Sequence, residues 1–143
     1  AVLVDQDHTE MTYAFAELLA SRFEKVTIVT SRERLAHDVS LINRQGIYHR
    51  LHALGVQLVL NSEIRDLDAL EDGLLHCVNV YSGAMTTVSD VAMITHASSR
   101  IPNDELLDPL LSIGLNPIAI GDCRAPRSLL ATTREAYQIA NSL

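Results

Sequence analysis

Three acidic residues near the start of the chain are the first with a spacing suited to chemistry. Asp5, Asp7 and Glu10 lie between an apolar segment and an amphipathic helical pattern in the stretch "VLVDQDHTEMTYAFAELLA". A strand, a turn and a helix in this order bind nucleotide phosphates when the turn carries G-x-G-x-x-G. Here the three acids stand where the three glycines would be.

The acids argue against a phosphate in this turn. The glycines of a nucleotide-binding turn let the backbone approach a pyrophosphate, which also gains from the positive end of the helix dipole. Two like charges about 4 Å apart repel by roughly 4 kcal/mol at a surface-like dielectric. An exposed helix dipole contributes only about 0.3–1 kcal/mol. The turn is therefore predicted not to bind a pyrophosphate, and we do not expect NAD(P) here.

An Asp-x-Asp pattern after a strand also resembles the start of a bacterial receiver domain, where paired acids hold magnesium. That fold needs an Asp after its third strand and a Lys after its fifth. The third expected strand ends in Leu60-Asn61-Ser62, and the only lysine is Lys25, before the second strand. We therefore reject a receiver domain.

Composition narrows the class of protein. The chain has 143 residues, 48% of them hydrophobic and 4% aromatic, which favours one domain with an aliphatic core, as in parallel α/β folds. The net charge of −7 and the lack of a basic stripe exclude a nucleic-acid partner. No apolar run approaches the roughly 18 residues of a membrane helix. Cys77 and Cys123 lie far apart, so we expect a reducing, cytoplasmic location.

The order of the apolar segments predicts an α/β architecture. Strands are expected at residues 1–4, 26–29, 56–60 and 91–95. A helix capped by Thr9 and a helix at 41–54, ended by Gly55, connect the first three strands through right-handed crossovers. The first helix is expected to turn five residues to the core: Met11, Ala14, Phe15, Leu18 and Leu19.

The second half has a different pattern. Short runs at 64–69, 74–81 and 85–88, separated by Asp72-Gly73 and Ser82-Gly83, predict a three-stranded antiparallel meander. A short helix closed by Gly114 and a strand at "PIAIGDC" should follow. The terminal helix should have five residues near its inner side: Leu129, Leu130, Thr133, Tyr137 and Ile139.

The most specific pattern is "AIGDCRAPRSLLATTREAYQIA", in which a strand is expected to end at Gly121-Asp122 just before a helix. It resembles the "GD" motif of flavoproteins with two dinucleotide domains. In those proteins the glycine lets the chain pass the flavin closely, and the aspartate accepts hydrogen bonds from the ribityl chain. Gly121 and Asp122 are thus the best cofactor contacts that the resemblance implies.

The sequence around this motif resembles that of one family. "IGDCRAPR" followed by "REAYQIA" looks like the C-terminus of the old yellow enzyme-like multidomain oxidoreductases, which include dienoyl-CoA reductases and trimethylamine and histamine dehydrogenases. "SRIPNDELLDPL" resembles the preceding segment of that family, "A-T-G-x-x-P-N-x-x-L", with Ser98-Ser99 in place of Thr-Gly. The likeness runs in the correct order through the whole chain.

This resemblance implies a Rossmann-type FAD/NAD(P)-binding, three-layer fold with a parallel sheet and an antiparallel meander. Residues 1–97 would form a degenerate NAD(P)-binding-like domain, and residues 98–143 would return into a flavin- or ADP-binding domain. An upstream barrel with FMN and a 4Fe-4S cluster would lie outside this chain, as its start at Ala1 inside a strand also suggests. Arg124 and Arg127 would either face FAD or ADP phosphates or be solvated.

The acidic turn then separates two branches of the family. Reductases keep the glycines, whereas the amine-dehydrogenase branch looks degenerate in this domain and passes electrons to a carrier protein. We therefore expect the C-terminal part of an FMN-dependent amine dehydrogenase or demethylase, with no catalytic residues of its own. The alternatives are an NADPH-dependent enoyl or dienoyl reductase domain and a ligand-free docking module. Arg32 and Arg34 either meet a 2′-phosphate or are solvated.

Histidines and cysteines give weaker patterns. His49 and His52 lie three residues apart on the second helix, and His8 lies among the acids of the turn, but neither group offers the three or four ligands that zinc needs. We expect no metal site. Cys123 lies near a helix N-terminus, which lowers thiol pKa values, but the absence of a nearby cysteine favours a packed thiol, as for Cys77.

Overall fold

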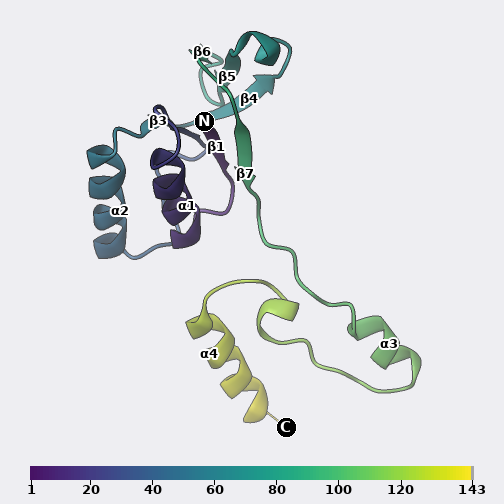
Figure 1. The fold of residues 1–143 in the computed structure, drawn as a ribbon. Helices are drawn as coiled ribbons and strands as arrows, with labels where there is room; N and C mark the ends of the chain where they lie inside the picture. The colour runs from purple at the N-terminus through teal and green to yellow at the C-terminus, as the bar shows by residue number, and fades with distance from the viewer. Residues whose placement is uncertain (143) are drawn as a thin grey trace. The chain divides into compact units, whose positions relative to one another are not determined.

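The computed structural model describes residues 1–142 and divides the chain into two compact units, Ala1–Ser99 and Arg100–Leu143 (Figure 1). Within residues 1–142, no helix combines the length and the apolar character needed to span a lipid bilayer.

A parallel sheet forms the centre of the first unit. Its strands have the order β3-β2-β1-β7, and all three neighbouring pairs are parallel. The four strands are β1 (Val2–Asp5), β2 (Thr27–Val29), β3 (Gln57–Val59) and β7 (Ile94–Ala97). Helices α1 (Glu10–Ala20) and α2 (Leu41–Ala53) connect the first three, and Gly55 follows α2 with a φ of 69°. These helices, the first three strands and the glycine after α2 were predicted and are confirmed, whereas β7 begins three residues later than the predicted strand at 91–95.

A second, antiparallel sheet forms between β3 and β7 of the chain. Its order is β4-β5-β6, and its strands are β4 (Ser62–Asp66), β5 (Leu75–Asn79) and β6 (Met85–Val88). A short 3₁₀ helix, η1 (Leu70–Asp72), precedes Gly73, whose φ of 71° requires the left-handed conformation that glycine adopts readily. The predicted meander is confirmed.

Alternate residues of the central strands pack on opposite faces of the parallel sheet. Leu3 and Ile28 join the core made with α1 and α2. Val2 and Val29 pack instead with Leu75 and other residues of the antiparallel part. The first unit thus has three layers, helices, parallel sheet and meander, and the predicted Rossmann-type fold is confirmed.

The prediction for the inner face of α1 was largely wrong. Met11, Phe15 and Leu18 are 76%, 38% and 51% exposed. The buried residues of α1 are Thr12, Tyr13, Ala16 and Leu19. The helix carries apolar residues on two sides, so spacing alone allows two orientations. The bond from the Tyr13 hydroxyl to buried Asp5 fits the orientation that the helix takes.

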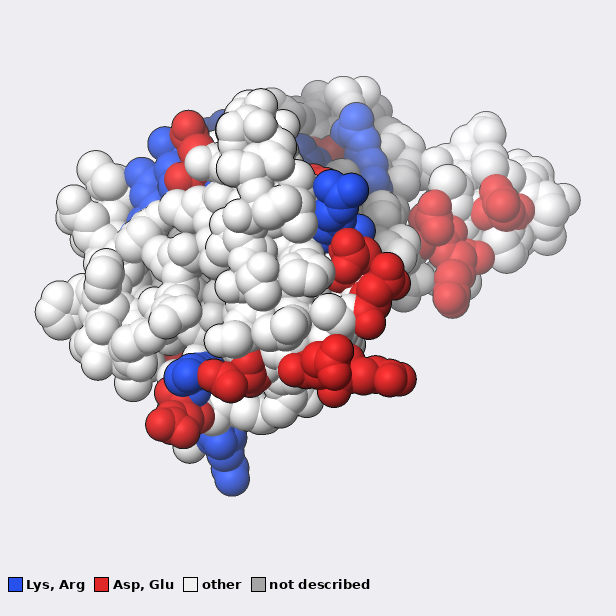
Figure 2. Space-filling model, turned by 90° about the horizontal axis from the view of Figure 1, so that it is seen from above, with Lys and Arg blue, Asp and Glu red and all other residues white. Residues whose placement is uncertain are grey.

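Charged side chains of both signs are interspersed on the face shown in Figure 2. Pairs in the first unit include Arg50 with Glu17, at 2.7 Å, and Lys25 with Asp90, at 2.6 Å. This face thus presents basic groups next to acidic groups rather than a continuous basic surface.

The second unit contains two helices and a turn. They are α3 (Leu107–Ser112), the 3₁₀ turn η2 (Gly121–Cys123) and α4 (Leu129–Ala140). The predicted short helix closed by Gly114 is confirmed by α3 and by the φ of 84° at that glycine. The strand predicted at "PIAIGDC" is wrong, because residues 115–120 form no strand. A strand needs a neighbour, and the described residues of this unit provide none.

Burial in the second unit is confined to two residues, Gly121 and Glu135, among residues 100–142. The prediction for the inner side of α4 was wrong for Leu129, Leu130 and Tyr137, which are 80%, 70% and 72% exposed, and for Thr133, which is exposed as well. The apolar residues of α4 therefore do not form a core with the rest of this unit.

Candidate functional site

The acidic turn lies at the carboxyl end of β1, the edge where Rossmann-type sheets bind their ligands. Asp5 is the last residue of β1 and is 1% exposed. One of its oxygens accepts the His8 N–H at 2.9 Å, and the other accepts the Tyr13 hydroxyl at 2.6 Å. The Asp5 carboxylate thus bonds a backbone amide of the turn that a phosphate would otherwise approach.

The other two acids of the turn are also bonded to neighbouring residues. Asp7 accepts hydrogen bonds from the hydroxyls of Thr9 and Thr12. Thr9 occupies the predicted N-cap position of α1, but its side chain bonds Asp7 and makes no cap hydrogen bond. Glu10 accepts a bond from the Asn43 side-chain amide at 2.7 Å, which ties the start of α1 to α2.

The loop that follows β2 packs beside this turn. Leu35 and Ala36 are fully buried in the core between sheet and helices. The Ala36 N–H donates to the Tyr13 hydroxyl, and the Leu35 N–H donates to the Tyr48 hydroxyl at 2.9 Å. Burial, with the neighbouring Asp5 carboxylate, raises the pKa of Tyr13 far above its ordinary value, so this hydroxyl keeps its proton. The loop is thereby fixed where dinucleotide-binding folds receive the ribose.

A second candidate site is the turn at Gly121 and Asp122. Gly121 is buried and has a φ of 62°, and a Cβ added there would lie 2.6 Å from Thr132 Cγ2. Only glycine fits this conformation against α4 without a shift of the neighbouring side chain. Asp122 is exposed, and its Oδ1 accepts the Arg127 N–H at 3.3 Å.

Glu135 connects the residues of this turn and was missed by the sequence analysis. Its Oε2 accepts the Gly121 N–H at 3.0 Å and Arg127 Nη2 at 3.1 Å, and its Oε1 accepts Arg124 Nη1. The Gly121 amide and the arginines lower the pKa of Glu135 below its ordinary value. Glu135 is the only acid within α4, and this was the signal that the sequence contained.

The turn is surrounded by more positive than negative charge. The Arg100 guanidinium donates to the carbonyl of Arg127 at 3.2 Å, so it joins Arg124 and Arg127. Three arginines against Asp122 and Glu135 leave one positive charge. A compact turn with an exposed carboxylate and an excess of guanidinium fits a ligand that carries hydroxyls and phosphates. The residues at Gly121–Asp122 therefore fit the nucleotide part of a flavin or ADP.

Solved structures of larger enzymes match this chain over nearly its whole length. The structure matches histamine dehydrogenase from Rhizobium sp. 4-9 with a TM-score of 0.75 and 28% identity over 99% of this chain and 22% of that one. It matches the 6-hydroxypseudooxynicotine amine oxidase HisD from Pseudomonas geniculata N1 with a TM-score of 0.76 and 19% identity, over 96% of this chain and 21% of that one. It matches a 2-naphthoyl-CoA reductase with a TM-score of 0.68 and 19% identity, over 99% and 21%. No family model matches, and a search of curated proteins finds no match.

The resemblance to the old yellow enzyme-like oxidoreductases is confirmed. These neighbours are a dehydrogenase, an amine oxidase and a CoA reductase, and further matches include a flavoprotein disulfide reductase from Escherichia coli. The chain spans about a fifth of the length of the three neighbours described above.

Arg32, the fifth predicted cofactor contact, follows β2 and belongs to a different unit from the other four. It lies in the first unit, whereas Gly121, Asp122, Arg124 and Arg127 lie in the second. Its side chain is exposed, and its backbone bonds Thr30 and Asn61. The structure thus brings four of the five predicted cofactor contacts together around one turn.

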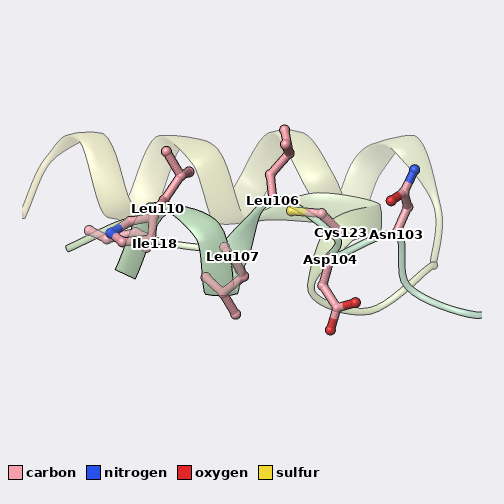
Figure 3. A pocket seen from close by; sticks show the side chains of 9 residues that line it. Asn103, Asp104, Leu106, Leu107, Leu110, Ile118 and Cys123 are labelled. Carbon is pink, nitrogen blue, oxygen red and sulfur yellow. The ribbon is translucent and has the colours of Figure 1, made fainter. Parts of the chain in front are cut away.

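An apolar cavity of about 170 Å³ lies within the second unit (Figure 3). Leucines of α3 and its preceding turn line it together with Ile118 and Cys123. The Cys123 thiol donates to the Ile120 carbonyl at 2.8 Å, so this thiol packs against the turn. Both cysteines are unpaired thiols, and burial raises the pKa of Cys77.

The histidines do not assemble a metal site in the part of the chain that the structure describes. There, no group of three or more His, Cys, Asp or Glu side chains is placed to hold an ion. His49 and His52 are exposed on α2, and His8 Nδ1 lies 3.4 Å from the Asp5 carboxylate.

Proposed function

We propose that this chain is the nucleotide-domain part of a multidomain, FMN-dependent oxidoreductase of the amine-dehydrogenase type, whose NAD(P) site no longer functions. The observation that carries the proposal is the Asp5 carboxylate bonded to the His8 amide inside the turn. Similarity to histamine dehydrogenase at 28% identity over nearly the whole chain supports the amine branch.

Two features oppose NAD(P) binding by the first unit. The Asp5 carboxylate takes the place of an anion at the start of α1 and would repel a second one. Leu35 and Ala36 are buried beside it and fill the space next to Tyr13. A dinucleotide would have to displace both a buried carboxylate and part of the core.

In the same proposal, the turn at Gly121 and Asp122 binds ADP or the nucleotide part of FAD. FMN and a 4Fe-4S cluster belong to a barrel of the parent protein, and an electron-transfer protein accepts the electrons. The parent protein is cytoplasmic, which the two unpaired thiols support.

Isothermal titration of the chain with NADH, NADPH and ADP tests this function. We expect heat of binding with ADP and none with NADH or NADPH. NADPH binding that is lost in Arg32→Ala would instead support a reductase domain and would overturn the proposal. Binding of none of the three would favour a docking module. Arg22→Ala is the charge-matched control, because it also removes one exposed guanidinium of the first unit.

A further inference from the structure

Glu135 occupies an unusual position, because one nearly buried carboxylate gathers three donors from a single turn. Its side chain is 10% exposed, whereas those of Arg124 and Arg127 are 62% and 49% exposed. An anion that approaches from solvent would therefore meet the arginines before it meets Glu135.

We propose that Glu135 is a positioning residue that holds Arg124 and Arg127 at the Gly121–Asp122 turn so that they bind the phosphates of a nucleoside diphosphate. This inference rests on the proposed function of the turn. The sequence pattern did not assign a role to Glu135, and the negative charge of Glu135 is explained by its contacts with two guanidinium groups.

The geometry gives the carboxylate two tasks. Its bond to the Gly121 N–H fixes the backbone of the turn against α4. Its bonds to the two guanidinium groups are charge-assisted, and such bonds are about twice as strong as neutral ones. A neutral amide at this position keeps an acceptor for Gly121 but loses the charge that holds two like-charged groups together.

The arginines retain donors for a ligand. A guanidinium has five N–H donors. Arg124 uses Nη1 toward Glu135, and Arg127 uses Nη2 toward Glu135 and Nε toward the Ala125 carbonyl. The outward parts of these half-exposed groups are thus oriented for phosphate oxygens, while the inner parts are held by the carboxylate.

The test uses the 143-residue chain with ADP as the probe, in the variants Glu135→Gln and Glu135→Asp. Glu105→Gln is the matched control, because Glu105 is an exposed acid of the same unit. We expect Glu135→Gln to weaken ADP binding at least tenfold, Glu135→Asp to recover part of the loss, and Glu105→Gln to bind as the unchanged chain does. Circular dichroism checks that all variants keep their helix content.

ADP binding by Glu135→Gln equal to that of the unchanged chain would overturn the inference, as would equal losses in the Gln and Asp variants. Proton exchange of the Arg124 and Arg127 guanidinium groups, followed by NMR, separates this inference from the proposed function. If the unchanged chain does not bind ADP, the ligand assignment fails. The positioning role then stands if Glu135→Gln, but not Glu105→Gln, speeds exchange of these guanidinium protons, and falls if exchange is the same in all three proteins.

Discussion

The first unit buries Leu3 and Leu51 to 1% exposure or less, whereas the second leaves Leu129 and Leu130 at least 70% exposed. Both units have helices with regular hydrogen bonding, so the difference lies in packing and not in local structure. In the first, apolar packing holds the fold. In the second, polar contacts of Glu135 hold the turn that carries the candidate site. A few polar contacts can therefore fix the residues of a site even in a unit that has no packed apolar core.

A pair of leucine substitutions is the strongest way to break this comparison. Leu51→Ala should reduce the free energy of unfolding by about 2–5 kcal/mol, because it leaves a cavity in a packed core. Leu130→Ala should change it by no more than about 0.5 kcal/mol, because the side chain is already 70% exposed. Urea unfolding followed by circular dichroism measures both. Equal losses in the two variants would mean that α4 is packed in solution.

A pair of tyrosines gives the next largest effect. Tyr13→Phe removes the hydroxyl between Asp5 and the Ala36 amide, and leaving buried polar groups without a partner costs about 1–3 kcal/mol. Tyr137→Phe, at a site 72% exposed, is the control and should be neutral. Thermal unfolding of both variants checks this, and a neutral Tyr13→Phe would argue against the loop contact.

Two glycines separate a backbone effect from a steric one. Gly55→Ala should cost about 1–2 kcal/mol, because its φ of 69° is left-handed but its Cβ would meet no atom within 4 Å. Gly121→Ala adds a contact with Thr132 Cγ2 at 2.6 Å and should speed amide exchange through the turn. Adding Thr132→Ser removes that methyl group and should slow the exchange again. No recovery in the double variant would leave the backbone conformation as the whole cause.

The smallest effect is a pH dependence confined to the turn. The pKa of Glu135 is lowered, chiefly by the Gly121 N–H and then by Arg124 and Arg127. Its contacts should therefore be fully present above the ordinary glutamate pKa and be lost as the pH falls through the lowered value. A carboxyl ¹³C titration should give Glu135 a midpoint below that of glutamate in an unstructured peptide. A midpoint at or above that reference would contradict the contacts.

Much of the first unit follows from the sequence. The strands, the meander and the end of α2 at Gly55 were predicted, because the spacing of apolar residues and the positions of glycines depend only on neighbouring residues in the sequence. The inner face of α1 was not, because Tyr13 is held by a partner eight residues earlier and spacing cannot reveal that bond.

The candidate site was predicted only in part. The resemblance selected Gly121, Asp122, Arg124 and Arg127, and the structure brings all four around one turn. The strand before them was wrongly predicted, because strand formation depends on a neighbour and not on the apolar run alone. Glu135 was missed because its role depends on how α4 packs on the turn, fourteen residues after Gly121.

The interlocked turn of the first unit also bears on how such a domain changes over evolutionary time. Replacing Asp5 by glycine would remove one carboxylate, yet Leu35 and Ala36 would still be buried and Asp7 and Glu10 would still be bonded to their neighbours. Each such substitution alone breaks a native contact before it opens any room for a cofactor. Under the proposed function, stepwise mutation toward an open turn therefore passes through less stable intermediates, so a lineage with this turn is expected to keep it closed.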